Sequence, residues 1–348
     1  PVDKGVGLVV DTMQYCAKHV PGWPPVSISG YHIREAGATA VQELAYTLAD
    51  GAWYVRKAIE RGMDVQDFAP RLSFFFDVHN DFFEEIAKFR AARRIWARVM
   101  REKYGATDPD AWRLRTHAQT AGVSLTAQQP ENNIARVAYQ ALAAVLGGTQ
   151  SLHTNSMDET LALPTEKSAR IALRTQQILA YESGVTNTID PLAGSYYVES
   201  LTDQLEAKAL AIFDQVDELG GVVPGIEMGF FQREIARSAQ RQQNDIESMR
   251  RVVVGVNGFT EGSDGVEIDT LKIDPSVEQR QCRRMAELRA GRDAPAAARA
   301  LEVLEQTSRA GGNLVPDILD CARAGCTLYE IRHSMAVVFG SYKEPVFF

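Results

Sequence analysis

The chain has 348 residues, of which 45% are hydrophobic and 24% are charged, and its formal net charge is -8. This length suits one large domain or two smaller ones, and the composition is that of an ordinary globular protein. The acidic balance argues against a protein that binds nucleic acid through bulk positive charge, but it leaves room for a small anionic substrate held by a few local donors.

The cysteines and the start of the chain indicate a cytoplasmic protein without a signal peptide. The first residues include Asp3 and Lys4 and no long apolar core. The uncharged run 137–157 contains glycines and polar residues that lipid disfavours, so we expect a buried helix followed by a strand there and no membrane span. The cysteines are scattered and form no metal-ligand pairs; they are Cys16, Cys282, Cys321 and Cys326.

Four units of one kind follow one another along the chain, each a short apolar run, a polar loop and an amphipathic segment. The apolar runs predict strands at 26–30, 72–76, 113–119 and 150–155. The amphipathic segments predict helices at about 38–62, 82–105, 134–147 and 164–184. Strands and helices that alternate in this way predict a parallel sheet with helices packed outside it.

Four such units are half of a closed (β/α)8 barrel, or they form an open sheet. No glycine-rich dinucleotide fingerprint follows any predicted strand, which disfavours the doubly wound alternative. Further helices are predicted at 201–219, 224–250, 277–309 and, as a short pair, within 315–339; an extended run is predicted at 252–256 and a loop at 262–265. We therefore expect an α/β fold. Residues 1–190 should form the second half of a (β/α)8 TIM-type barrel, and residues 191–348 should form a mostly helical C-terminal region.

Polar and ionisable residues gather at the predicted strand ends. In a parallel barrel, the loops after the strands converge on one mouth, where active sites are built. Side chains of this kind at four successive strand ends favour an active site at the mouth over ordinary solvent-exposed turns. They are Tyr31, His32 and Glu35 with the first strand, Arg71, Ser73 and Phe75 with the second, His117, Gln119 and Gly122 with the third, and Asn155 and Glu159 with the fourth.

Two other kinds of site are less well supported by these residues. His32, His117 and His153 could supply a metal site, but no tight spacing such as H-E-x-x-H occurs, so we expect none. A Schiff-base aldolase needs a lysine at a strand end, and none of the four predicted strand ends carries one.

Five segments, in this order, resemble the adenosylcobalamin-dependent acyl-CoA mutases, the methylmalonyl-CoA mutase family. They are 27–37 (SISGYHIREAG), 71–76 (RLSFFF), 117–122 (HAQTAG), 149–156 (TQSLHTNS) and 190–197 (DPLAGSYY). The similarity runs from about residue 8 to 257 and more weakly to the end of the chain. Several long motifs in the family's order are a specific signal.

The resemblance implies a radical isomerisation, in which the thioester carbonyl group of an acyl-CoA migrates to the neighbouring carbon with adenosylcobalamin as cofactor. It implies His32 as the catalytic group that hydrogen-bonds the thioester oxygen. It implies Tyr31, Arg71, Ser73 and Gln119 as substrate-binding residues, with Arg71 and Ser73 on the CoA portion. The implied cofactor-binding residues are Glu35, Phe75, His117, Gln119, Gly122, Asn155 and Glu159.

The same resemblance implies partners. The family's first four barrel strands and its cobalamin-binding domain, marked by D-x-H-x-x-G, are not found; 77–79 (DVH) begins like that motif, but residue 82 is Phe. We therefore expect an N-terminal half-barrel chain or an oligomer that closes the sheet, and a cobalamin-binding domain or subunit that supplies the cobalt-ligating histidine. Without them we expect no activity. We expect neither nucleic acid nor a membrane as partner.

The expected substrate pair is methylmalonyl-CoA and succinyl-CoA, because the loop 128–133 (QQPENN) looks more like the methylmalonyl type than the isobutyryl type. Mutases of 2-hydroxyisobutyryl-, ethylmalonyl- and isobutyryl-CoA remain open. So does a non-catalytic, truncated chain that serves as a scaffold or assembly partner.

Overall fold

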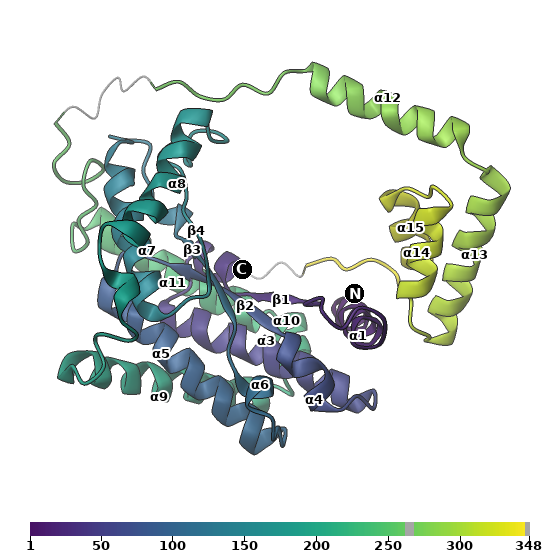
Figure 1. Ribbon diagram of the computed structural model, residues 1–348, viewed down its shortest axis with the longest axis horizontal. Coiled ribbons are helices and arrows are strands. Elements are labelled where there is room, and N and C mark those ends of the chain that lie inside the picture. The colour runs from purple at the N-terminus through teal and green to yellow at the C-terminus, as the bar shows by residue number, and fades with distance from the viewer. Residues whose placement is uncertain (262–267, 345–348) are drawn as a thin grey trace.

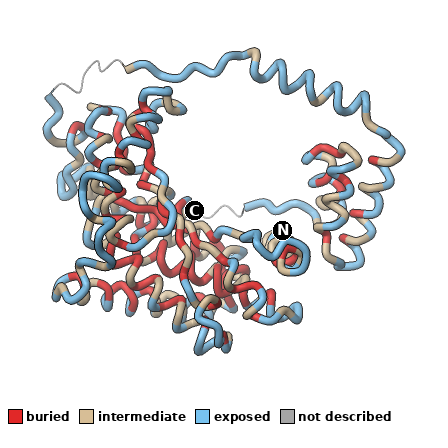
Figure 2. Tube along the Cα trace, in the orientation of Figure 1, coloured by how far each residue is buried: buried red, intermediate tan, exposed pale blue. Residues whose placement is uncertain are grey.

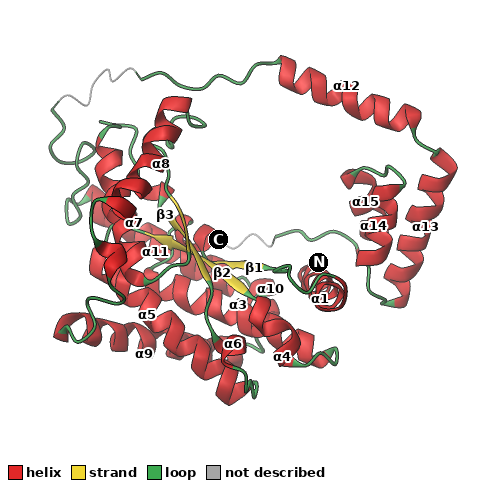
Figure 3. Cartoon of the chain, viewed as in Figure 1, coloured by secondary structure: helices red, strands yellow, loops and turns green. Residues whose placement is uncertain are grey.

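The computed structural model describes residues 1–261 and 268–344 and contains a four-stranded parallel sheet (Figures 1 and 3). The strands β1 (Ser27–Ser29), β2 (Ser73–Val78), β3 (Thr116–Thr120) and β4 (Ser151–His153) lie in chain order. In register, Phe75 lies opposite both Ser29 and His117. The predicted parallel α/β arrangement is confirmed, and every strand lies within about three residues of its predicted range. The third strand starts at Thr116, because the preceding residues belong to a short helix and its exit turn.

Helices connect each strand to the next, as parallel strands require. The connection after β1 contains α2 (Tyr31–Glu35), α3 (Ala40–Glu60), α4 (Val65–Phe68) and a 3-10 turn (Ala69–Arg71). After β2 come α5 (Phe82–Arg98), a π-helical turn (Val99–Lys103) and α6 (Pro109–Trp112). After β3 come a 3-10 turn (Gly122–Ser124) and α7 (Asn132–Gly147), and after β4 come α8 (Glu166–Tyr181) and a 3-10 turn (Val185–Asn187).

The two faces of the sheet differ in character because side chains alternate along a strand. Phe74, Phe76 and Val78 of β2 are fully buried beneath the helices, where Phe74 meets Trp96 of α5 edge to face at 4.7 Å. Burying each such side chain contributes about 1.5–3 kcal/mol to folding. The opposite face carries the half-buried Phe75 and, on β3, polar side chains. The helix-covered face therefore holds the core, and the buried residues of the sheet and its helices are red in Figure 2. The polar side chains of β3 lie on the opposite face.

Every element described after β4 is a helix. The helices α9 (Tyr196–Glu218), α10 (Val222–Glu227) and α11 (Phe230–Glu247) follow α8 and its 3-10 turn, and α9 packs against α3 and α5. Then come α12 (Ser276–Gly291), α13 (Ala294–Ala310), α14 (Val315–Arg323) and α15 (Leu328–Phe339). No residue of α12 is buried. The last three enclose a small apolar cluster of their own that meets α1 (Val2–His19), as Figure 1 shows.

Several predicted elements differ from those observed. The predicted helix 224–250 is two helices, because Gly229 adopts the left-handed conformation (φ 68°) between α10 and α11. The predicted helix 277–309 is also two, because Asp293 caps a new helix by accepting from Ala296 N at 2.9 Å. The predicted extended run 252–256 forms only an isolated bridge between Val254 and Gly258.

The N-terminal helix α1 was not predicted, although the pair within 315–339 was. The predicted loop 262–265 lies outside the described residues. Among residues 1–261 and 268–344, we find no helix with the length and apolar character that a membrane crossing requires.

Candidate active site

The predicted mouth residues gather where α2 begins, directly after β1. Gly30 joins the two elements, and its N–H donates to Phe75 O at 2.8 Å. A Cβ atom at Gly30 would lie 2.0 Å from Thr47 Oγ1 of α3, so only glycine allows this close approach. The approach places Tyr31, His32 and Glu35 of α2 beside the carboxyl ends of β2 and β3.

A hydrogen-bonded line crosses this edge of the sheet. Gln119 Nε2 of β3 donates to Tyr31 OH and to Asn155 Oδ1, both at 2.9 Å. Asn155 in turn donates from Nδ2 to Thr120 O at 2.8 Å. Tyr31 and Asn155 are both buried, so these polar groups are fixed in place. Three of the predicted residues, distant in sequence, are thus brought together.

Aromatic rings form the floor beside this line. The rings of Tyr31 and Phe75 stack with centroids 5.0 Å apart, and His117 meets Phe75 edge-on at 4.9 Å. His32 is exposed, and its Nδ1 lies 3.2 Å from Ser29 Oγ. A ring held through one nitrogen in this way can present the other to a ligand.

The histidines of β3 and β4 are kept neutral. Burial lowers the pKa of His117, and the nearby His153 lowers it further; partial burial also lowers the pKa of His153. His117 Nδ1 lies 2.7 Å from Ser151 Oγ. In the part of the chain that the structure describes, no three His, Cys, Asp or Glu side chains are grouped as metal ligands.

Two residues with carboxyl groups, Glu35 and Glu159, accompany this hydrogen-bonded line. Glu35 accepts from Val123 N, which lies 2.9 Å from Oε2 and 3.1 Å from Oε1. Partial burial raises the pKa of Glu159, and Glu35 raises it further. Burial raises the pKa of Tyr31 far above its usual value, with Glu35 adding to the effect. The phenol therefore stays protonated.

Gly122 completes a tight polar hollow. A Cβ atom there would lie 3.0 Å from Glu35 Oε2, 3.2 Å from Asn155 Nδ2 and 3.3 Å from Tyr31 OH. These contacts are closer than ordinary packing allows. A glycine at this position therefore keeps open the space in which the three polar groups meet.

Arg71 and Ser73 are not at this mouth, contrary to their assignment to a carboxyl strand end. Arg71 precedes β2 and Ser73 is its first residue, so both lie at the amino end of the sheet. Burial lowers the pKa of Arg115, and the positive charges of Arg113 and Arg71 lower it further, while Asp110 opposes this effect. The three arginines therefore lie near one another. A cavity of about 770 Å³ opens here, lined in part by Ser73, Arg113, Arg115, His117 and Ser151.

The sequence reasoning missed a buried ionic group beneath the mouth. Lys88 Nζ donates to Glu43 Oε2 at 2.7 Å and to Asp77 O at 2.6 Å, and it lies 2.5 Å from Glu85 Oε2. All four of these residues are fully buried. Arg34 of α2 pairs with Glu85 at 3.3 Å, which ties the site helix to this group. The signal in the sequence for this ionic group was a charged residue next to apolar ones, as at Lys88 before Phe89.

Comparison with known proteins gives three related findings. Residues 1–341 match the family described as Methylmalonyl-CoA mutase. The chain is 48% identical over 344 residues to "Methylmalonyl-CoA mutase" of Rhizobium meliloti (strain 1021), covering 98% of this chain and 48% of that protein. It is 45% identical over 349 residues to "2-hydroxyisobutanoyl-CoA mutase large subunit" of Aquincola tertiaricarbonis, covering 100% of this chain and 62% of the relative.

The human protein "Methylmalonyl-CoA mutase, mitochondrial" is 44% identical over 346 residues, which cover 99% of this chain and 46% of that protein. The chain thus spans about half the length of most of the curated relatives it matches.

Proposed function

Since this chain belongs to the methylmalonyl-CoA mutase family, we propose that it supplies part of the active site of an adenosylcobalamin-dependent acyl-CoA mutase. The reaction is a carbon-skeleton isomerisation of an acyl-CoA thioester. The observation that carries the proposal is the hydrogen-bonded line of Tyr31, Gln119 and Asn155 next to the exposed ring of His32. It fixes donors around one hollow at the carboxyl edge of a parallel sheet, where such active sites are built.

His32 is the catalytic residue in this proposal. A ring held at Nδ1 by Ser29 can offer Nε2 to the thioester oxygen and stabilise the charge that develops on it. Tyr31 packs beside it and, because its pKa is raised, stays a neutral donor. Gln119 is held by two hydrogen bonds and can orient the substrate next to the Tyr31 hydroxyl.

The residues around Gly122 suit the adenosyl part of the cofactor. Glu35 and Asn155 offer carboxylate and amide groups for ribose hydroxyls, and Gly122 leaves the room between them. Glu159, whose pKa is raised by partial burial and by Glu35, is proposed to add a second carboxyl group for the cofactor. Phe75 and His117 offer aromatic rings on the same side. Adenosylcobalamin, when bound, supplies the radical that the isomerisation needs. The cobalt-ligating histidine is proposed to come from a cobalamin-binding domain or subunit.

The CoA portion is proposed to bind along the open face toward the amino end of the sheet. Arg71, Arg113 and Arg115 gather there beside the 770 Å³ cavity, and guanidinium groups suit the phosphates of CoA. Ser73 and Ser151 add small polar side chains between that end and the mouth. Arg71 and Ser73 thus keep their proposed substrate role, but at the opposite end of the strand.

We propose methylmalonyl-CoA and succinyl-CoA as the substrate pair, because the 128–133 loop looks more like the methylmalonyl type than the isobutyryl type. Gln129 in that loop has a positive φ of 49° and donates to Phe259 O and Glu261 O, both at 3.0 Å. The relative named as a 2-hydroxyisobutanoyl-CoA mutase large subunit has similar identity, so that substrate is the second candidate.

We further propose that 1–190 is the second half of a (β/α)8 barrel, followed by a helical region, with a partner segment or chain completing the barrel. The four consecutive parallel strands support this reading.

The test uses the full enzyme that contains this chain, loaded with adenosylcobalamin and given each acyl-CoA in turn. His32→Ala should lower kcat by about 10²–10³-fold, the usual cost of losing an oxyanion donor. His19→Ala, at an exposed histidine outside the site, is the control. Full turnover by the His32 variant would remove that role, and no turnover by the unaltered enzyme would favour the non-catalytic scaffold.

A further inference from the structure

The pairing between β3 and β4 ends just before the residues that meet at the mouth. Gln119 and His153 are the last residues paired between these two strands. Thr120 still belongs to β3 and is completely buried, whereas the chain after His153 leaves the sheet. Thr154 turns toward α8, where its hydroxyl donates to a backbone carbonyl at 2.8 Å. Strand pairing therefore does not set the position of Asn155.

Thr120 continues the connection with two hydrogen bonds to Asn155. The backbone Asn155 N donates to Thr120 Oγ1 at 2.9 Å, and the side-chain Asn155 Nδ2 donates to Thr120 O at 2.8 Å. Both residues are buried, so bulk water does not compete for these contacts, and losing one would leave a buried donor unpaired. The main chain and the side chain of Asn155 are thus both fixed to one residue.

The contact with the Thr120 carbonyl also fixes the direction of the hydrogen-bonded line. A backbone carbonyl only accepts, so Asn155 turns Nδ2 toward Thr120 O and leaves Oδ1 to face Gln119. Gln119 must then present Nε2, which donates to Asn155 Oδ1 and to Tyr31 OH, both at 2.9 Å. The opposite orientation of the Gln119 amide would place two acceptor oxygens against each other. The Tyr31 oxygen is therefore an acceptor in this line.

The hydroxyl proton of Tyr31 is left for an acceptor outside the line. Gln119 Nε2 has no lone pair that could take it. Within residues 1–261 and 268–344, the hydrogen bond of the Tyr31 hydroxyl is the one that it accepts from Gln119. We propose that Thr120 is a positioning residue: it holds Asn155 so that Gln119 orients the Tyr31 hydroxyl to donate a hydrogen bond to the substrate. This role rests on the proposed function, in which Tyr31 and Gln119 bind the acyl-CoA.

The experiment measures kcat of the full enzyme at saturating adenosylcobalamin and acyl-CoA. Thr120→Val keeps the volume of the side chain but removes its hydroxyl, so kcat should fall about tenfold, the usual worth of one hydrogen bond. Thr120→Ser keeps the hydroxyl and should retain most of the activity. The control is Thr202→Val, because Thr202 is equally buried and its hydroxyl donates to Val198 O within α9, outside the site. An unchanged kcat in Thr120→Val, or a Ser variant as slow as Val, would overturn the proposal.

A double-mutant cycle with Tyr31→Phe separates positioning from a general loss of structure. If Thr120 acts through the Tyr31 hydroxyl, Thr120→Val should slow the Tyr31→Phe enzyme far less than it slows the unaltered one, because that hydroxyl is already gone. Equal fold losses in the two backgrounds would show that Thr120 acts on something else and would overturn the proposal. If Thr120→Val does not fold, Thr120→Ala removes the same hydroxyl without adding a methyl group in its place, and it decides the matter in the same cycle.

Hydrogen exchange at the Asn155 amide tests the contact without turnover. Exchange should be at least about tenfold faster in Thr120→Val than in the unaltered enzyme, and Thr120→Ser should restore the protection. If exchange behaves in this way but the unaltered enzyme isomerises no acyl-CoA, the proposed function and the role of Thr120 in it both fail. If the enzyme isomerises an acyl-CoA and exchange at Asn155 is the same in all three proteins, only the positioning role fails.

Discussion

Several residues beneath the mouth are charged although they lie in the apolar core, where an unpaired charge would destabilise the folded state. Lys88 is completely buried, and its burial is tolerated because Glu43 and Glu85 lie 2.7 and 2.5 Å from its ammonium group. These carboxylates raise the pKa of Lys88 despite the opposing effect of burial. The ionic group connects α3, α5 and, through Arg34, the site helix α2. Its removal should therefore affect both the stability and the site.

Lys88→Met is expected to lower the free energy of unfolding by about 3–5 kcal/mol, because it leaves buried carboxylates without their cation. Urea unfolding of the full enzyme measures this change. The matched control is Lys57→Met, which breaks an exposed pair with Glu60 and should cost no more than about 1 kcal/mol. Equal losses in the two variants would contradict the stated role of Lys88.

His79 should make stability depend on pH. Burial lowers its pKa to about 3, and Arg34, Arg251 and Lys88 contribute to the shift. The unfolded chain takes up the proton near pH 6.5 and the folded chain does not, so stability falls as the pH drops from about 6.5 toward 3. At pH 5 this loss is about 2 kcal/mol. His79→Gln, which keeps an acceptor for Asn80 N without titrating there, should show a smaller loss between pH 7 and pH 5 in the same unfolding measurement. An identical loss would exclude His79 as its source.

At the scale of elements, the site depends on short turns that hold helices and loops close to the sheet. The turn Gly122–Ser124 follows β3 at once, and its Val123 N–H anchors Glu35 of α2. The same turn touches Asn155, which follows β4. Three connections therefore meet at one glycine, and any side chain there must displace at least one of them.

Gly122→Ala should fold, because Gly122 does not occupy the left-handed region, but it should weaken adenosylcobalamin binding by about tenfold or more as the polar groups shift apart. Isothermal titration with the cofactor measures this. Gly105→Ala at a left-handed turn outside the site is the contrasting control, since it should lower stability and leave the affinity unchanged. Unaltered affinity in the Gly122 variant would show that the hollow is not used.

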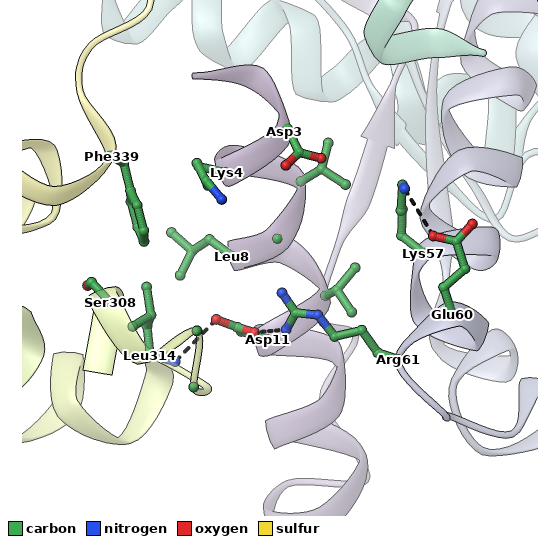
Figure 4. Close-up of a pocket in the computed structure, with 15 residues that line it drawn as sticks. Asp3, Lys4, Leu8, Asp11, Lys57, Glu60, Arg61, Ser308, Leu314 and Phe339 are labelled. Atoms are coloured by element: carbon green, nitrogen blue, oxygen red, sulfur yellow. Dashed lines mark hydrogen bonds and ion pairs between the residues drawn. The ribbon is translucent and has the colours of Figure 1, made fainter. Parts of the chain in front are cut away.

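At the scale of the whole molecule, the α13–α15 cluster docks on α1 through one buried carboxylate. Asp11 pairs with Arg61, which follows α3, and accepts from Leu314 N at 3.2 Å (Figure 4). The Asp11 carbonyl accepts from Asn313 Nδ2 at 2.9 Å. A cavity of about 360 Å³ lies beside these contacts, lined also by Leu8 and Phe339. The junction therefore combines the polar contacts of Asp11 with apolar contacts of Leu8 and Phe339.

Asp11→Ala should release the cluster from α1. Hydrogen exchange of the full enzyme should then be at least about tenfold faster at the amides of α14 that the junction protects, because Leu314 N and Arg61 each lose a charged partner. Asp3 lines the same cavity, so Asp3→Ala serves as the control. If exchange in α14 is the same in both variants, apolar contacts and not Asp11 hold the cluster.

The amino-acid sequence by itself determined the repeated strand and helix units, the parallel sheet and the family. These rest on local information: apolar runs, helical spacing, glycine stops and motifs such as SISGYHIREAG, all readable within a few neighbouring residues. The local signals misled where a single residue interrupts a pattern, as Gly229 and Asp293 interrupt two predicted helices. The roles of the predicted site residues stay predictions, although several of those residues meet.

Only the tertiary structure decided which distant groups meet. Arg71 precedes the predicted strand 72–76 as well as β2, so the chain order alone places it at the amino end of the sheet, but its approach to Arg115 before β3 is a tertiary contact. Lys88 and Glu43 are 45 residues apart, and their pairing depends on the packing of α3 against α5. Burial and charge at those positions are properties of the packed helices and sheet, so no local pattern in the chain could specify them.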